Sequence, residues 1–166
     1  MPSSPLYTIT GIMKAVSEIK PKTILDIGVG FGKFGFLIRE YFDLRPGNKP
    51  GYDKWSLTID GIEIFGEYIT DVHKYIYNKI YIGNAIDVID KHNFYYDLVL
   101  AVDILEHYTK KDGIRFIDKM NGIAENIIIS TPFIYFDQDE MYKNKHEKHL
   151  AGWDLNDFID FGFKYL

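Results

Sequence analysis

The sequence predicts an α/β fold in which a doubly wound, mostly parallel sheet carries helices on both faces. Short runs rich in Ile, Val and Leu alternate along the chain with longer segments whose apolar residues recur at helical spacing. The short runs are apolar throughout, which is typical of parallel strands that are covered on both sides. The length of 166 residues corresponds to about one domain, so we expect residues 1–166 to form a single unit.

The expected strands and helices alternate along the whole chain. Strands are expected at residues 22–28, 57–64, 80–82, 97–102 and 126–130. Helices are expected at residues 33–42, 67–77, 85–90, 110–124 and 154–161. This order, strand then helix, predicts right-handed crossovers that bring every strand-to-helix loop to one edge of the sheet.

Turn-forming residues mark where these elements end. The first strand, KTILDIG, ends in a glycine turn, and the Pro, Gly and alternating charges of residues 43–56 predict an inserted loop. The fifth strand, NIIIS, is stopped by Thr131 and Pro132, and Gly162 is expected to cap the last helix. Residues 163–166 begin a further apolar run, so we expect the C-terminal strands of the sheet to be incomplete.

The composition excludes several classes of function. With 19 Lys and Arg against 24 Asp and Glu, a net charge of −5 and no basic stripe, we expect no nucleic-acid partner. The absence of cysteine excludes disulfides, thiolate zinc sites and a cysteine nucleophile. The chain shows neither a basic leader nor an apolar run of about 18 residues. We therefore expect a soluble, cytoplasmic protein with no membrane partner.

The most informative segment is DIGVGFGKFG, residues 26–35, which carries four glycines at a strand-to-helix turn. Such a turn lets the backbone approach a ligand closely. A phosphate-binding P-loop would need Ser or Thr after Lys33, where Phe34 stands, and a dinucleotide fingerprint would place its ribose acid too far along the chain. Asp26 favours a different ligand, because a carboxylate repels a pyrophosphate and attracts an ammonium or sulfonium group. A glycine turn without any ligand is the remaining alternative.

The segment ILDIGVGFGKFG resembles the first motif of class I S-adenosylmethionine (SAM)-dependent methyltransferases. SAM carries an ammonium and a sulfonium group but no phosphate, which agrees with the position of Asp26. The resemblance implies a Rossmann-like fold, SAM as cofactor and S-adenosylhomocysteine (SAH) as product. It also implies that Gly28, Gly30 and Gly32 pack against the methionine part of the cofactor.

The resemblance assigns further cofactor positions after the second and third strands. Glu63 stands where the family has an acid that accepts hydrogen bonds from both ribose hydroxyls, and Asp60 is the weaker candidate. A solvated strand end is the alternative for Glu63. Asn84 and Ala85 stand where the family has Asp-Ala near the adenine, and an Asn oxygen can still accept from an amine. The alternative for Asn84 is a helix cap.

A second resemblance covers the fourth strand and the residues after it. The segment YDLVLAVDILEH, residues 96–107, is similar to the family segment that passes under the methionine moiety. This implies that Val102 and Asp103 line the cofactor and that His107 lies near the mouth of the site. His107 is therefore a candidate catalytic base, and its alternative role is to order the loop that contains it.

The long segment after the fifth strand, residues 133–153, lies where this family usually builds acceptor contacts. It matches a pattern found in a subset of bacterial and phage methyltransferases at Gln138, Asn144, Glu147, His149 and Trp153. We expect residues 147–153 to form a lid in which Trp153 stacks on the acceptor and His149 acts as a catalytic base. The alternative for Trp153 is a hydrophobic staple before the last helix.

No metal site is expected. Residues 146–149 do not form the zinc protease motif, because its second histidine would stand at the position of Leu150. Asp137, Asp139 and Glu140 carry oxygen donors of the kind that Mg²⁺ prefers, but a solvated acidic turn is the favoured interpretation.

The sequence therefore predicts an enzyme that moves a methyl group from SAM to a small-molecule or glycan acceptor, with O-methylation as the expected reaction. The alternative is a non-catalytic SAM-binding module that serves a partner protein. An NAD-dependent oxidoreductase is disfavoured by Asp26. Because an exposed strand edge needs cover, a homodimer that covers the edge of the sheet is a further expectation.

Overall fold

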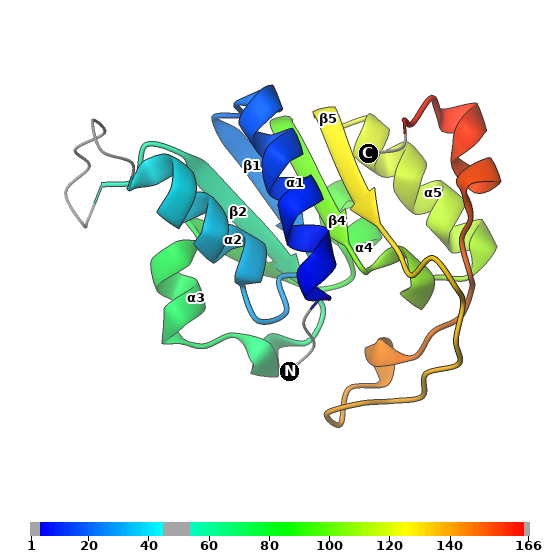
Figure 1. Ribbon diagram of the computed structural model, residues 1–166. Helices are drawn as coiled ribbons and strands as arrows, with labels where there is room; N and C mark the ends of the chain where they lie inside the picture. The colour runs from blue at the N-terminus through cyan, green and yellow to red at the C-terminus, as the bar shows by residue number, and fades with distance from the viewer. Residues whose placement is uncertain (1–3, 45–53, 165–166) are drawn as a thin grey trace.

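The computed structural model describes residues 4–44 and 54–164 of the chain (Figure 1). Its strands are β1 (Thr23–Ile27), β2 (Thr58–Glu63), β3 (Lys79–Ile82), β4 (Tyr96–Val102) and β5 (Ala124–Ser130). Its α-helices are α1 (Leu6–Ile19), α2 (Lys33–Ile38), α3 (Asp71–Ile76), α4 (Ala85–Lys91) and α5 (Lys110–Asn121). Shorter helical turns are η1 (Arg39–Asp43), η2 (Gly66–Tyr68), η3 (Leu105–His107), η4 (Lys145–Glu147) and η5 (Leu155–Phe161).

The five strands form one parallel sheet in the order β3-β2-β1-β4-β5. This confirms the predicted fold class. The chain runs outward from β1 through β2 to β3 and then crosses to β4 on the other side of β1. The strand order therefore reverses between β1 and β4, and a doubly wound sheet binds ligands at the carboxyl ends of the strands beside such a reversal.

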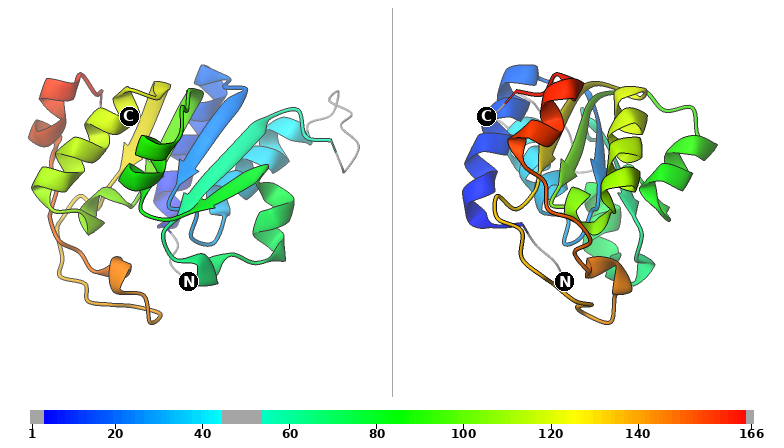
Figure 2. Two further views of the ribbon diagram at one scale, coloured as in Figure 1. Left: turned by 180° about the vertical axis from the view of Figure 1, so that it is seen from behind. Right: turned by 90° about the vertical axis from the view of Figure 1, so that its right-hand side faces the viewer.

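Two hydrophobic cores cover the two faces of the sheet. On one face α1, α2 and α3 pack against Ile24, Ile59 and Leu98, and on the other α4 and α5 pack against Leu25 and Val99. Seen from behind, α4 and α5 lie in front of the sheet, and α1 and α2 lie beyond it (Figure 2). Because neighbouring residues of one strand enter different cores, each strand must be apolar throughout. This is the pattern from which the strands were predicted.

Helix α1 is absent from the sequence prediction. Its buried residues Ile12, Ala15 and Val16 recur at helical spacing and pack on the sheet. The helix ends at Lys20, which has a left-handed φ of 54°. Pro5 precedes the first helical residue and makes no side-chain cap, so the usual polar signal for a helix start is missing.

Two predicted helices differ in the structure. The helix predicted at residues 33–42 is α2, which continues into the π-helical turn η1. There Arg39 and Asp43 form a buried ion pair at 2.7 Å. The helix predicted at residues 67–77 is divided into η2 and α3, with Thr70 capping the start of α3. Most of the predicted loop at residues 43–56 lies outside the described residues.

The C-terminal part agrees in part with the prediction. The helix predicted at residues 154–161 is the 3₁₀ turn η5, and Gly162 ends it with a left-handed φ of 75°. Phe163 and Lys164 are not in a strand, and residues 165–166 lie outside the described residues. Strand β5 is the edge of the described sheet, and its cover by a second copy stays a prediction. In the described part of the chain, no helix is long and apolar enough to cross a membrane.

Candidate functional site

The carboxyl ends of β1, β2 and β4 open into a cavity of about 490 Å³, a size that suits a small ligand. The site residues predicted from the sequence line this cavity, except Gly32, Trp153 and the weaker candidate Asp60. The N-terminal end of α1 lies at the same end of the sheet, as does the segment that follows β5 (Figure 1). We call that segment, residues 131–150, the cap segment. The start of α1 and the cap segment therefore both border the cavity.

The glycine loop follows β1 and needs its glycines for backbone reasons. Gly28, Gly30 and Gly32 have φ values of 78°, 51° and 81°, which L-residues with side chains rarely adopt. A Cβ atom on Gly28 would also lie 1.9 Å from Cδ1 of Ile104. Gly32 does not face the cavity but forms the N-terminal boundary of α2. The loop is thus a tight turn whose first part borders the hollow.

Glu63, the last residue of β2, fastens the glycine loop. Its Oε2 accepts from the Gly30 amide at 2.9 Å and its Oε1 accepts from the Phe65 amide at 2.9 Å. Burial raises the pKa of this carboxyl, and the two amide hydrogen bonds oppose that rise. Glu63 is 5% exposed, so it is not a solvated strand end. Each carboxylate oxygen can accept a second hydrogen bond, which leaves acceptor capacity toward the cavity.

Asp26, on the neighbouring strand, is a buried acid beside the same loop. The Tyr77 hydroxyl donates to its Oδ2 at 2.5 Å. Burial raises the pKa of Asp26 to about 7, although the Tyr77 hydrogen bond lowers it, and the nearby Glu63 charge adds to the rise. A carboxyl group in this position gains most from a cationic partner, because a positive charge would offset its lost hydration.

His73 is a second residue that supports the loop and that the sequence did not reveal. Its Nδ1 accepts from the Thr70 amide at 3.0 Å, so the proton lies on Nε2, which donates to the Gly30 carbonyl at 3.0 Å. His73 is fully enclosed in the protein, between α3 and the loop. Its role depends on the packing of α3 onto the loop, and no local pattern indicates it.

Asn84 and Ala85 follow β3 and begin α4. The Asn84 side chain accepts from the Ile86 amide at 3.0 Å. The helix-cap interpretation is therefore confirmed. Both residues also line the cavity, so a contact with adenine remains a prediction that is compatible with the cap.

Val102 ends β4, and both Val102 and the following Asp103 line the cavity. Asp103 has a left-handed φ of 53°, which is uncommon for a residue with a side chain. The Ser130 hydroxyl donates to its Oδ1 at 2.6 Å, and the Asp103 amide donates to the Ser130 carbonyl at 3.0 Å. These bonds join the end of β5 to the end of β4.

His107 and His149 lie together on the wall of the cavity. Their ring centroids are 5.1 Å apart. The Nδ1 atom of His107 faces the Lys148 carbonyl at 3.1 Å, and that of His149 faces the Phe136 carbonyl at 2.9 Å. A carbonyl only accepts, so each Nδ1 carries a proton, and in the neutral ring Nε2 is the nitrogen with the lone pair. Burial lowers the pKa of His107, which favours the neutral ring.

Glu106, next to His107, is a buried acid that the sequence did not single out. It is 3% exposed, and among the described residues its Oε2 has no hydrogen-bond partner. Burial raises the pKa of this carboxyl to about 8, and the charges of Asp103 and Glu147 contribute to the rise. The cavity therefore contains a third buried carboxyl group on its acceptor side.

The polar residues of the cap segment mainly hold that segment together. Glu147 accepts from the Tyr68 hydroxyl at 3.0 Å and from the Asn144 amide group at 3.2 Å, and Gln138 donates to the Glu147 carbonyl at 2.7 Å. The His149 amide donates to the Gln138 carbonyl at 3.0 Å. This network fixes a folded cover, joined to η2 by Tyr68.

The predicted role of Trp153 in the lid is wrong. Trp153 is 4% exposed and belongs to the core on the α4–α5 face. Its Nε1 donates to the Leu105 carbonyl at 3.0 Å, and its ring fills the space beside Gly113, where a Cβ would lie 2.2 Å from Cζ2. Lys110 lies over one ring face at 4.2 Å from the centroid. No ring face is left to stack on an acceptor.

Asp137, Asp139 and Glu140 are exposed on the cap segment. Asp137 accepts from the Tyr135 hydroxyl at 3.0 Å, and Asp139 lies 3.4 Å from the Lys148 ammonium. These contacts fit the interpretation of a solvated acidic turn.

No family model and no curated protein matches the sequence. Solved structures do match the fold. A SAM-dependent methyltransferase from Archaeoglobus fulgidus is 16% identical over 93% of this chain and 65% of its own, with a TM-score of 0.63. The N-terminal domain of EvdMO1, solved with SAH bound, is 13% identical over 95% of this chain and 70% of its own, with a TM-score of 0.61.

A magnesium protoporphyrin IX methyltransferase from Synechocystis, also with bound SAH, is 14% identical over 74% of this chain and 52% of its own, with a TM-score of 0.51. The chain spans 36%, 59% and 65% of the length of three matched structures. At these identities the likeness concerns the fold. The chain has the Rossmann-like α/β fold of class I SAM-dependent methyltransferases.

Proposed function

We propose that the protein transfers a methyl group from SAM to a hydroxyl group of a small-molecule or glycan acceptor. The observation that carries the proposal is the pair of buried carboxyl groups, Asp26 and Glu63. They end neighbouring strands on either side of the glycine loop and face one cavity. Such a pair suits a ligand with a cationic group and two hydroxyls, and it does not suit a pyrophosphate.

The residues present fit SAM. Asp26, with its pKa raised to about 7 by burial, gains from an ammonium group, and Glu63 keeps lone pairs for the ribose hydroxyls. Asn84 and Ala85 also line the cavity, and in this proposal they contact the adenine. When bound, SAM supplies a methyl group activated by the positive sulfonium. The fold neighbours that contain SAH support the same choice of cofactor.

The acceptor side of the cavity offers proton acceptors and apolar surface. His107 and His149 line the cavity with Nδ1 held by backbone carbonyls, so in the neutral ring Nε2 can accept a proton. A hydroxyl acceptor must lose its proton as its oxygen attacks the methyl carbon. Phe136 and Tyr142 line the cavity and are about half exposed. Their rings suit contact with a sugar or another planar acceptor.

The proposal is tested by calorimetry and then by turnover. SAH should bind with one site per chain, and NADH should not bind at the same concentration. A panel of hydroxylated small molecules and oligosaccharides is then incubated with methyl-labelled SAM. SAH binding with label transfer supports the enzyme, whereas SAH binding without transfer to any acceptor supports the non-catalytic module. Binding of NADH in place of SAH would overturn both.

A further inference from the structure

Three metal-ligating side chains meet on the acceptor side of the cavity, although the sequence predicted no metal site. Glu106 and His107 come from η3, directly after β4, and His149 comes from the cap segment. One ligand atom of each lies within 4.8 Å of the others. Two buried residues and one half-buried residue, distant in sequence, thus converge on one point.

The Glu106 carboxyl is the second observation that points to a ligand. Its Oε2 is buried and has no hydrogen-bond partner in the described part of the chain. The neighbouring Thr131 hydroxyl is buried as well and acts to lower the pKa of Glu106, but neither its oxygen nor Oε2 of Glu106 has a partner within ordinary hydrogen-bond geometry among the described residues. A buried carboxylate oxygen without a partner is destabilising, because nothing replaces the hydrogen bonds to water that it has lost. Asp103 and Glu147 lie near enough for their negative charges to act on Glu106. A cation bound here would give Oε2 a partner and would offset these negative charges.

The two imidazoles are held as metal ligands usually are. Each donates its Nδ1 proton to a backbone carbonyl, His107 to Lys148 and His149 to Phe136. The Nε2 lone pairs are thereby fixed, because the partner of one ring nitrogen sets the tautomer of the other. The Leu150 amide donates to the Glu106 carbonyl at 2.7 Å, which holds His149 beside Glu106. The rings are therefore prepared to ligate without rearrangement of the backbone.

We propose that Glu106, His107 and His149 bind one divalent transition-metal ion at the acceptor end of the cavity. Two nitrogen donors and one carboxylate suit Zn²⁺ or Mn²⁺ better than Ca²⁺ or Mg²⁺, which prefer oxygen donors. Bonds of about 2.0–2.2 Å would hold tetrahedral donor pairs about 3.5 Å apart, so small side-chain rotations complete the site. Three protein ligands leave a position open to an oxygen ligand from the cavity.

The role of this open position rests on the proposed function. The open position would bind the acceptor hydroxyl and lower the pKa of that hydroxyl, so that proton loss would not depend on a histidine base. Ion binding itself requires neither SAM nor an acceptor, so it can be measured alone.

The test measures ion binding to chelator-treated protein in the absence of SAH. Calorimetry with ZnCl₂ and MnCl₂, with MgCl₂ for comparison, gives affinity, and elemental analysis after dialysis gives stoichiometry. We expect one Zn²⁺ or Mn²⁺ per chain and weaker binding of Mg²⁺. Glu106→Gln, His107→Gln and His149→Gln should each weaken binding by about 10-fold or more.

The matched control is His92→Gln. His92 also faces a backbone carbonyl through Nδ1, that of Val88 at 2.9 Å, but it follows α4 at the opposite end of the sheet. This variant should bind the ion as the wild type does. The proposal is overturned if the wild-type chain retains no stoichiometric ion, whatever the variants do. It is also overturned if folded Glu106→Gln, His107→Gln and His149→Gln bind as tightly as His92→Gln. Calorimetry with SAH on the same samples shows separately whether the cofactor proposal stands.

Discussion

The Tyr77 hydroxyl donates a 2.5 Å hydrogen bond to Oδ2 of Asp26, and this contact joins the end of α3 to the end of β1. Tyr77 is 4% exposed, and its ring occupies space that two glycines leave open. A Cβ on Gly35 would lie 2.5 Å from the Tyr77 ring, and one on Gly61 would lie 3.3 Å from it. These two glycines therefore leave room for the Tyr77 ring, and the Tyr77 hydroxyl orients the Asp26 carboxyl group, which lines the cavity.

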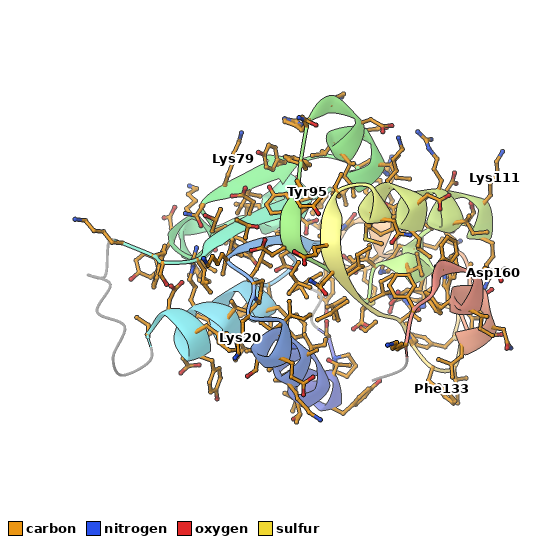
Figure 3. All side chains as sticks on the ribbon, turned by 90° about the horizontal axis from the view of Figure 1, so that it is seen from above. Lys20, Lys79, Tyr95, Lys111, Phe133 and Asp160 are labelled. Atoms are coloured by element: carbon orange, nitrogen blue, oxygen red, sulfur yellow. The ribbon has the colours of Figure 1, made fainter. Side chains whose placement is uncertain are left out.

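Tyr77→Phe keeps the ring and removes this one hydrogen bond. We expect the free energy of unfolding to fall by about 1–2 kcal/mol, because a buried acceptor loses its donor. The pKa of Asp26 should rise further, so SAH should bind less tightly at pH 7. Urea unfolding and calorimetry measure the two effects. Tyr95→Phe, at a position 70% exposed and labelled in Figure 3, is the control and should change neither. Equal behaviour of the two variants would contradict the role of Tyr77.

Asp26→Asn should be more stable than the wild type at high pH and should bind SAH poorly. The Asp26 pKa is about 7 in the folded protein and about 3.9 in the unfolded chain, so the folded state holds the proton more strongly. The contribution of Asp26 to stability is complete below about pH 4 and is lost as the pH rises through 7. The variant should therefore gain about 1–4 kcal/mol over the wild type between pH 5 and pH 8.

Unfolding of both proteins at several pH values measures this difference. Because acids distant from Asp26 titrate equally in both proteins, the difference reports on Asp26 and on the neighbouring Glu63 whose charge acts on it. A stability difference that stays constant from pH 5 to pH 8 would show that Asp26 titrates as an ordinary carboxyl group. If Asp26 faces the ammonium group, Asp26→Asn should gain stability and lose SAH affinity together. The loss of affinity should be about 10-fold or more, the equivalent of about 1.4 kcal/mol.

Glu63→Gln should weaken SAH binding by about 10- to 150-fold, the equivalent of losing a charge-assisted hydrogen bond of about 1.5–3 kcal/mol. The amide keeps one oxygen for the Gly30 or Phe65 amide, so the glycine loop should stay folded. Asp60→Asn is the matched control on the same strand. Asp60 accepts from the Tyr96 hydroxyl at 2.8 Å and does not line the cavity. A dissociation constant for Glu63→Gln equal to that of Asp60→Asn would remove Glu63 from the site.

The sequence predicted the strands because each one is rich in Ile, Val and Leu, and a sheet covered on both faces requires this. It placed Asp26 and Glu63 near the ends of neighbouring strands because each stands close to the end of such a run. Tyr77, His73 and Glu106 could not be found in this way. Their roles arise where α3 packs on the glycine loop and where η3 turns into the cavity, and both contacts join segments that are distant in sequence.

The roles of the cap-segment side chains also could not be predicted from the sequence. Its polar residues match a family pattern, but the pattern does not say whether a side chain faces the cavity or the segment itself. Gln138, Asn144 and His149 all line the cavity, and each also forms a hydrogen bond within the segment. Phe133 is 85% exposed and lies at the margin of the molecule in Figure 3. Burial, which decides between these roles, depends on the fold of the whole chain.

Trp153→Phe separates the core role found in the structure from the acceptor role predicted by the sequence. The variant loses the Leu105 hydrogen bond and part of the packing beside Gly113. We therefore expect the free energy of unfolding to fall by about 1–3 kcal/mol. Turnover per folded molecule should not change, because Trp153 does not line the cavity. Phe136→Leu, on the cavity wall, should show the opposite pattern, with little loss of stability and slower methyl transfer. Normal stability with impaired turnover in Trp153→Phe would restore the lid interpretation.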